Sequence, residues 1–207
     1  RLIDPPDFVC CGSVLLRAID EMAWLSMAAR TLAMAEGMGL DVMTICNGCF
    51  ESFSEARLRL LEDPAKAAKV NELLSADGLR FGGSAKVLHL AQVLHREIGI
   101  QRLESAVRRR LEGLRAAAHY GCHVLRPSNR LSFDSAESPR VLDELIGALG
   151  AESVDWRYKL WCCGNVTLPF DEGLSLSMAA RKLAAAYEAG AHCIVTICPS
   201  CQLQFDS

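Results

Sequence analysis

The hydrophobic and polar positions of the chain form a helical pattern followed by a strand-like pattern, and this pair of patterns occurs twice. Residues 20–36 are rich in Ala, Leu and Met with apolar positions at helical spacing, and glycines follow as helix-ending residues, which predicts an α-helix. A short apolar run with β-branched residues comes next, at 42–45, and is typical of a buried parallel strand. The same two patterns recur at about 174–188 and 193–197, so we expect the same pair of elements there.

A repeated segment lies within each of these two predicted helices. The sequence SMAAR occupies residues 26–30 and occurs again at 177–181. Outside the repeated pair, the pattern predicts further elements: a helix at 51–61, an amphipathic helix at 85–98, a basic helix at 102–114 with Arg108, Arg109 and Arg110, and a small apolar strand at 115–118. The alternation indicates an α/β fold of two pseudo-symmetric Rossmann-like halves with parallel sheets, at residues 1–110 and 111–207.

Eight of the cysteines form two copies of one four-cysteine motif. In each copy a vicinal pair followed by glycine precedes a Cys-x-x-Cys pair, with 34 residues between them, and the second copy lies 152 residues after the first. The first copy consists of Cys10, Cys11, Cys46 and Cys49, and the second of Cys162, Cys163, Cys198 and Cys201. Each Cys-x-x-Cys pair lies at the carboxyl end of a predicted strand, where the start of a following helix favours anionic sulfur.

Adjacent cysteines indicate metal binding rather than a disulfide. A bridge between neighbours strains the peptide, because a disulfide prefers a longer Cα separation than one peptide step allows. A four-cysteine structural zinc site and a thioredoxin-like dithiol are the alternatives. Zinc requires neither a vicinal pair nor a fifth thiolate, and a dithiol leaves the vicinal pairs unexplained. Iron–sulfur ligation accounts for the whole pattern.

A fifth cysteine, Cys122, precedes the second copy and follows the predicted strand at 115–118. If the halves are true repeats, its counterpart lies about 40 residues before Cys10, outside this chain, which begins at Arg1 without a methionine. We therefore expect sequence that precedes Arg1. Cys193 belongs to neither copy and is expected to be a small buried hydrophobic residue within its strand.

Composition and charge restrict the class of protein. The chain has 51% hydrophobic and 23% charged residues with a net charge of −3, which is typical of a globular domain and argues against a nucleic-acid partner. No apolar run approaches the roughly 18 residues needed to cross a bilayer and no signal peptide opens the chain, so we expect a cytoplasmic protein without a membrane span. In that reducing compartment, ten cysteines indicate metal binding or catalysis.

Together, these motifs resemble the catalytic B subunit of heterodisulfide reductase and its bacterial relatives. The resemblance covers nearly the whole chain and includes TICNGCF at 44–50, HYGCH at 119–123 followed by RPS at 126–128, and CPSCQLQFD at 198–206. In that family each cysteine motif binds one non-cubane 4Fe-4S cluster through five cysteines. The resemblance therefore implies two such clusters, one on Cys122, Cys162, Cys163, Cys198 and Cys201 and the other on Cys10, Cys11, Cys46 and Cys49.

The resemblance also implies an activity and partner subunits. The family reduces a disulfide to two thiols between its two clusters, and it works with a flavin-containing A subunit and a cubane-cluster C subunit. The chain has no GxGxxG fingerprint and no P-loop, so electrons must come from a partner. The alternative function is an electron-relay subunit of a related flavin-based bifurcating or other oxidoreductase complex, and turnover of a disulfide separates the two.

Histidines are the candidates for proton transfer. His123 lies beside Cys122 and is the candidate catalytic residue, because an imidazole can donate a proton near neutral pH. The alternative is that His123 only hydrogen-bonds a sulfide or a carbonyl oxygen. His89, His95 and His192 are expected to have core or surface roles.

Overall fold

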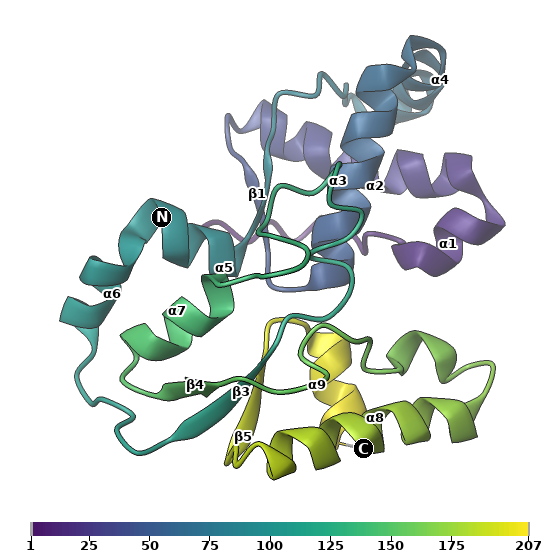
Figure 1. Cartoon of the computed structure of the whole chain (residues 1–207). Coiled ribbons are helices and arrows are strands. Elements are labelled where there is room, and N and C mark those ends of the chain that lie inside the picture. The colour runs from purple at the N-terminus through teal and green to yellow at the C-terminus, as the bar shows by residue number, and fades with distance from the viewer. Residues whose placement is uncertain (1, 207) are drawn as a thin grey trace. The chain divides into compact units, whose positions relative to one another are not determined.

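Two compact units make up the chain in the computed structural model, which describes residues 2–206 (Figure 1). The first unit contains the chain up to Thr44 together with Gly48–Leu88, and the second contains Ile45–Asn47 and the chain from His89 onward. The backbone therefore passes from one unit to the other three times. The two predicted halves, 1–110 and 111–207, concern the internal repeat and stay a prediction.

The first unit is built around one long helix. Its elements are α1 (Ser13–Ile19), α2 (Glu21–Gly37), β1 (Val42–Thr44), α3 (Asn47–Glu62), α4 (Pro64–Leu74), the 3-10 helix η1 (Ser75–Asp77) and β2 (Val87–His89), where the end residues Asn47 and His89 belong to the second unit. Helix α2 packs against α1 and α4, and β1 and β2 form a two-stranded sheet. Trp24, Leu25 and Leu32 of α2 are fully buried in the core.

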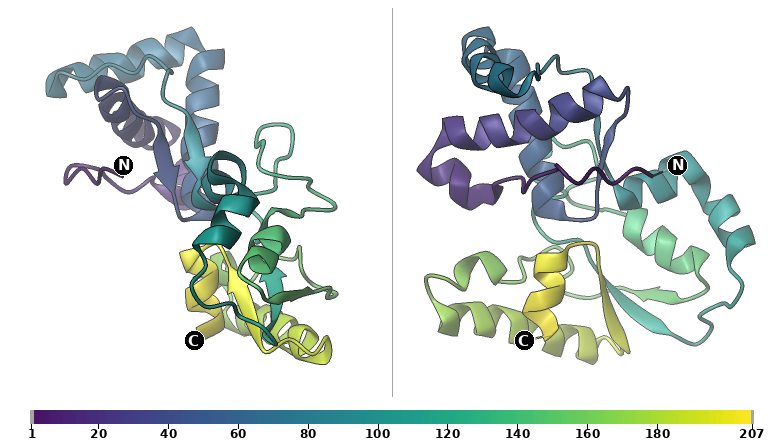
Figure 2. Two further views of the ribbon diagram at one scale, coloured as in Figure 1. Left: turned by 90° about the vertical axis from the view of Figure 1, so that its left-hand side faces the viewer. Right: turned by 180° about the vertical axis from the view of Figure 1, so that it is seen from behind.

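The second unit contains a parallel sheet with helices packed on it. Its elements are α5 (Leu90–Gln92), the π-helix η2 (Val93–Gly99), α6 (Ile100–Ala106), β3 (Arg115–His119), α7 (Val141–Ala148), β4 (Glu152–Val154), the 3-10 helix η3 (Asn165–Thr167), α8 (Glu172–Glu188), β5 (Cys193–Thr196) and α9 (Pro199–Asp206). The strand order is β4-β3-β5, and both pairings are parallel. Helix α7 packs on β3 and β4, while α8 and α9 pack on β5 (Figures 1 and 2). The predicted α/β fold with parallel sheets and Rossmann-like connections is confirmed.

Matching caps begin the two long helices of the repeat. The Asp20 carboxylate accepts a hydrogen bond from the backbone N–H of Ala23 at 3.0 Å, and the Asp171 carboxylate accepts one from Leu174 at 2.8 Å. Each aspartate satisfies a backbone donor that the first turn of a helix leaves without a partner. The predicted helices at 20–36 and 174–188 therefore begin for the same reason.

Two predicted helices are partly wrong. Residues 87–89, within the predicted helix at 85–98, form β2, because the backbone pairs with β1 through the hydrogen bond from Val42 N to Lys86 O at 2.9 Å. Helix α6 ends at Ala106, so Arg108, Arg109 and Arg110 do not lie on a helix face. Sheet pairing overrides helical periodicity in the first case, and three adjacent like charges and the following glycine turn disfavour a helix in the second.

Candidate metal centre

Five cysteine thiols of the second unit come together. The Sγ atoms of Cys122 and Cys162 are 4.0 Å apart. Cys163, Cys198 and Cys201 pack in one buried group, and the Cys163 thiol is hydrogen-bonded to both Cys162 and Cys201. The thiols thus form one continuous series, and they are the five residues that the sequence predicts for the second motif. Their role as ligands stays a prediction.

Hydrogen bonds among the thiols lower the pKa of two of them and raise the pKa of the other three. Hydrogen bonding from Cys122 holds the pKa of Cys162 well below its usual range, and hydrogen bonding from Cys201 does the same for Cys198. The donors, Cys122 and Cys201, have raised pKa values in turn, and the neighbouring Cys162 raises the pKa of Cys163 to about 11. Neighbouring thiols oppose one another's ionisation because like charges repel. A bound cationic metal would remove this conflict, since metal ligation releases thiol protons.

A closely packed glycine lies next to the thiols, at the turn that follows β3. Gly121 has φ +75°, where side chains are strained. A Cβ atom built on Gly121 would lie 2.7 Å from Nδ2 of Asn47, 3.6 Å from Sγ of Cys201 and 3.8 Å from Nε2 of His119. A glycine therefore lets the turn pack closely against Asn47 and the Cys201 thiol. The soft sulfur donors gathered beside this turn fit an iron–sulfur group.

The vicinal cysteines are held by a tight turn against α8. Gly164 has φ +97°, and its N–H donates to Sγ of Cys162 at 3.4 Å. The hydroxyl of Ser175 donates to the carbonyl oxygen of Gly164 at 3.0 Å. A Cβ on Gly164 would lie 2.7 Å from the Ser175 carbonyl oxygen, so only glycine lets the turn approach the helix. The turn fixes the position of Cys162 relative to α8.

The start of α9 supports the Cys-x-x-Cys pair of the second motif. Cys198 directly precedes α9, and the backbone N–H groups of Cys201 and Asn47 add to the lowering of its pKa. Backbone N–H groups at a helix start favour anionic sulfur. This is the strand-to-helix position that the sequence predicts for both pairs.

The structure divides the cysteines of the first motif between the units. In the first unit Cys11 is buried and Cys10 is exposed, and hydrogen bonding from Cys49 lowers the pKa of Cys11 to about 6. Cys46 lies in the second unit, packed against the buried group of Cys163, Cys198 and Cys201. The assignment of these four cysteines to one cluster stays a prediction.

Cys193 is exposed rather than buried, which corrects the expectation from the sequence. It is the first residue of β5, and β5 is an edge strand of the described sheet. A continuous apolar run predicts a strand that is covered on both faces, and in the described residues the start of this strand is not covered.

The remaining histidines differ in their surroundings. His89 caps α5 by accepting a hydrogen bond from Ala91 N at 3.1 Å, His95 pairs with Glu144 at 2.6 Å, and His192 accepts a hydrogen bond from Arg115 N at 3.2 Å. These are structural roles, as expected. His123 lies close enough to Cys162 for its charge to help lower the pKa of that thiol. Its role in catalysis stays a prediction.

Sequence reasoning missed two buried polar side chains beside the thiols. His119 has no exposed surface, and one of its ring nitrogens lies within 4.8 Å of the thiols of Cys163 and Cys201. Lys182 is 1% exposed and feels the charges of four of the thiols. A signal for Lys182 was available, because it follows Ser175 and Ala179 at helical spacing on the buried face of α8.

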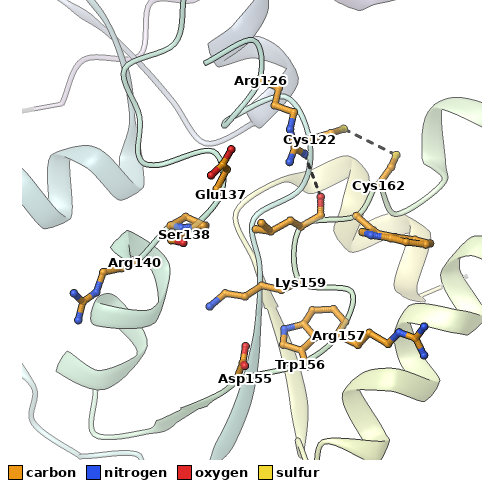
Figure 3. A pocket seen from close by; sticks show the side chains of 13 residues that line it. Cys122, Arg126, Glu137, Ser138, Arg140, Asp155, Trp156, Arg157, Lys159 and Cys162 are labelled. Atoms are coloured by element: carbon orange, nitrogen blue, oxygen red, sulfur yellow. Dashed lines mark hydrogen bonds between the residues drawn. The ribbon is translucent and has the colours of Figure 1, made fainter. Parts of the chain in front are cut away.

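A pocket of about 840 Å³ opens onto Cys122 and Cys162 (Figure 3). Both cysteines line the pocket, and Figure 3 shows the Arg126 side chain close to them. The charged residues that line it are four bases, Arg126, Arg140, Arg157 and Lys159, and two acids, Glu137 and Asp155. The pocket gives a small molecule access to one end of the series of thiols.

Known proteins match nearly the whole of this chain. The family described as "Cysteine-rich domain" (CCG) matches residues 1–54 and 116–206. The B subunit of the ferredoxin/F420H2-dependent CoB-CoM heterodisulfide reductase of Methanosarcina acetivorans is 38% identical over 99% of this chain and 69% of its own length. The chain belongs to the CCG cysteine-rich family of heterodisulfide reductase B subunits. This CCG protein also resembles a subunit with a different name: the 8-methylmenaquinol:fumarate reductase membrane anchor subunit of Wolinella succinogenes is 34% identical over 95% of the chain and 68% of its own length.

A solved structure shares the fold of this CCG protein. The crystal structure of a hypothetical protein from Helicobacter pylori aligns with a TM-score of 0.74 over 98% of this chain at 15% sequence identity. The CCG protein spans about a third of that longer chain, 36%. Within residues 2–206, no helix is both long enough and apolar enough to span a membrane.

Proposed function

We propose that this CCG protein is the iron–sulfur subunit of an oxidoreductase complex that reduces a disulfide to two thiols. The proposal assigns one non-cubane 4Fe-4S cluster to Cys122, Cys162, Cys163, Cys198 and Cys201, and a second to Cys10, Cys11, Cys46 and Cys49. The observation that carries it is the continuous series of five thiols in the second unit. The names of the heterodisulfide reductase relatives support the same reaction class.

The residues of the second unit have separate tasks in this reaction. When bound, the clusters would supply electrons one at a time, and two electrons with two protons convert the disulfide into two thiols. The pocket admits the substrate to the side of the site where Cys122 and Cys162 lie, and its excess of arginine and lysine favours a substrate with anionic groups. His123, beside Cys122, holds a proton at its imidazole for transfer to a departing sulfur.

Electrons reach the site from partner subunits in this proposal. The relatives are named as the B component of heterodisulfide reductases, and that name implies further subunits. We propose a flavin-containing A-type subunit and a cubane-cluster C-type subunit as those partners.

A second candidate function is electron relay without disulfide cleavage. The relative from Wolinella succinogenes favours it, because that subunit is named for a fumarate reductase and is 34% identical to this chain. Both functions require clusters. Only the first requires a disulfide to be consumed.

The first experiment measures iron, acid-labile sulfide and zinc in anaerobically purified protein. The proposal expects equal iron and sulfide, about eight of each for two four-iron clusters, and a Cys198→Ser variant that loses about half of both. A Cys193→Ser variant serves as control and keeps the full content. Zinc without sulfide would overturn both functions.

The second experiment assays disulfide reduction with reduced viologen as electron donor. Consumption of one disulfide per two electrons supports the reductase. Clusters that are reduced by viologen but never reoxidised by a disulfide would instead establish the relay.

A further inference from the structure

Lys182 and His119 are buried polar groups that the proposed reaction does not use. We propose that both groups act on the cluster of the second motif: the Lys182 ammonium group is the buried counter-charge of the cluster, and the His119 N–H donates a hydrogen bond to a cluster sulfur. Together they raise the reduction potential of the cluster. This inference rests on the proposed function.

Lys182 carries a charge that no carboxylate balances in the part of the chain that the structure describes. Its side chain is 1% exposed, and its ammonium group donates to the carbonyl oxygens of Tyr158 and Trp161, the latter at 3.0 Å. The ammonium nitrogen also lies 4.6 Å from the ring centroid of Trp156. Carbonyl oxygens and an aromatic face solvate a cation without neutralising it, and a buried charge is costly unless an anion pairs with it.

The anions that act on Lys182 are cysteine sulfurs. Burial lowers the pKa of Lys182 to about 8, and the charges of four thiols, Cys163, Cys201, Cys162 and Cys122, oppose that shift. These four are among the five proposed ligands of one cluster. A cluster held by thiolates is anionic, so its presence gives the buried ammonium group the partner that the protein alone lacks.

His119 has hydrogen-bonding capacity that faces the same site. The ring has no exposed surface, and within the described residues neither Nδ1 nor Nε2 makes a hydrogen bond of good geometry. Burial lowers the pKa of the ring to about 3, so the ring is neutral with one N–H. Contact with the Lys159 backbone opposes this lowering only weakly.

The position of the ring directs this capacity toward the thiols. Phe205 packs edge-on against the His119 ring at 5.1 Å and 78°. One ring nitrogen lies within 4.8 Å of the thiols of Cys163 and Cys201. A buried N–H without a good partner is unfavourable, and sulfur of a cluster held by these cysteines would accept its hydrogen bond.

Both groups favour the reduced cluster. Reduction adds negative charge, which a nearby buried cation stabilises, and hydrogen bonds to cluster sulfur stabilise the more electron-rich form. Loss of either group should therefore lower the reduction potential without removing any cysteine ligand.

A redox titration followed by electron paramagnetic resonance tests the role of Lys182. We expect Lys182→Met to reduce the equilibrium constant for cluster reduction about tenfold, which is about 59 mV for one electron, while Lys182→Arg stays close to wild type. Arg181→Gln is the matched control, because it removes one positive charge from the neighbouring, exposed position of α8 and should leave the potential unchanged. Equal potentials in Lys182→Met and wild type would overturn the counter-charge role of Lys182.

Pulsed electron paramagnetic resonance with 15N-labelled histidine tests His119. The inference expects a weak nitrogen coupling to the paramagnetic cluster that disappears in His119→Phe and persists in His95→Gln, together with a lower potential in His119→Phe. A strong coupling would mean that the imidazole binds iron, and it would overturn the hydrogen-bonding role. If Lys182→Met does not fold, the reduction potential of His119→Phe alone tests the inference, and a potential equal to that of the wild type would overturn it.

Iron and sulfide analysis of the same samples distinguishes failure of the proposed function from failure of this inference. A wild-type protein without iron and sulfide overturns the proposed function and this inference with it. A full complement of iron and sulfide with potentials that neither substitution changes overturns this inference alone.

Discussion

At the scale of single residues, Gly164 shows why the vicinal cysteines are followed by glycine. Its φ of +97° and the 2.7 Å between a Cβ and the Ser175 carbonyl oxygen both exclude a side chain. The glycine allows the turn to lie against α8, and the Ser175 hydroxyl then bonds its carbonyl oxygen. The packing of the turn thus sets the position of the cysteines before any metal arrives.

Gly164→Ala should therefore disrupt the site. We expect a loss of stability of about 2–4 kcal/mol, from strained backbone and from the forced shift of α8, together with loss of iron. Gly147→Ala is the control, because Gly147 lies in α7 with nothing within 4 Å of an added Cβ, and it should be neutral or stabilising by about 0.5–1 kcal/mol. Urea denaturation with iron analysis measures both. Equal effects of the two substitutions would refute the packing role of Gly164.

His123→Gln tests the proposed proton donor. Removal of a general acid typically lowers the rate by roughly 10²-fold, and we expect that loss in kcat of disulfide reduction with unchanged iron content. His95→Gln, at the ion pair with Glu144, should keep kcat. An unchanged kcat in His123→Gln would leave His123 with only a hydrogen-bonding role.

The residue scale also shows what the sequence could and could not reveal about the site. The cysteines were predictable because soft ligands at a repeated spacing have few other uses. Lys182 was predictable in principle, since a lysine at a core-facing helical position is unusual. The buried ring of His119 was not, because its surroundings depend on how β3 and α9 fold around it.

At the scale of elements, an ionic link joins the starts and ends of three helices in the first unit. Glu21 in the first turn of α2 pairs with Arg59 of α3 at 2.5 Å and with Lys66 of α4 at 2.9 Å. Hydrogen bonding from Lys66, followed by that from Arg59, holds the pKa of Glu21 below its usual value of 4.5. The link therefore fixes α3 and α4 against α2 with a partly exposed network.

Stability should depend on pH through this network. The folded pKa of Glu21 is lowered, so its stabilisation is present above pH 4.5 and is lost as pH falls through the folded value. We expect Glu21→Gln to cost about 0.5–1 kcal/mol at pH 7, where the pair is partly screened by solvent, and to cost nothing at the lowest pH where the protein still folds. Urea denaturation across this range measures the difference. Glu72→Gln, at an exposed position of α4, should show no such dependence.

Prediction of the elements succeeded where local signals agreed and failed where distant pairing decided. Helices α2 and α8 have strong formers, aspartate caps and glycine ends, so their positions follow from local sequence. The local sequence does not predict strand β2, because β2 forms through pairing with β1, which is distant in the sequence. Strand β4 of the second unit has only three residues, and it was missed because its pairing partner, β3, lies far away in the sequence.

At the scale of the whole molecule, access to the site should depend on the charge of the substrate. Arg126→Gln removes one of the four bases that line the pocket. We expect KM for a dicarboxylate disulfide to rise several-fold with kcat unchanged, and KM for neutral hydroxyethyl disulfide to stay the same. Arg110→Gln, a substitution outside the pocket lining, is the control. A rise in KM for both disulfides would mean that Arg126 shapes the pocket rather than attracts the substrate.

The three passages of the backbone between the units determine when some contacts can form during synthesis. Residues 45–47 belong to the unit that begins again only at His89, and Cys46 packs with cysteines of positions 163, 198 and 201. A ribosome synthesises Cys46 long before it makes those partners, so residues 45–47 lack the cysteines they pack against until the second unit has been made. In an anaerobic cell extract, we expect Cys46 to react faster with an alkylating reagent when translation stalls after residue 150 than when it continues past Cys201, because the packing partners of Cys46 then partly cover it.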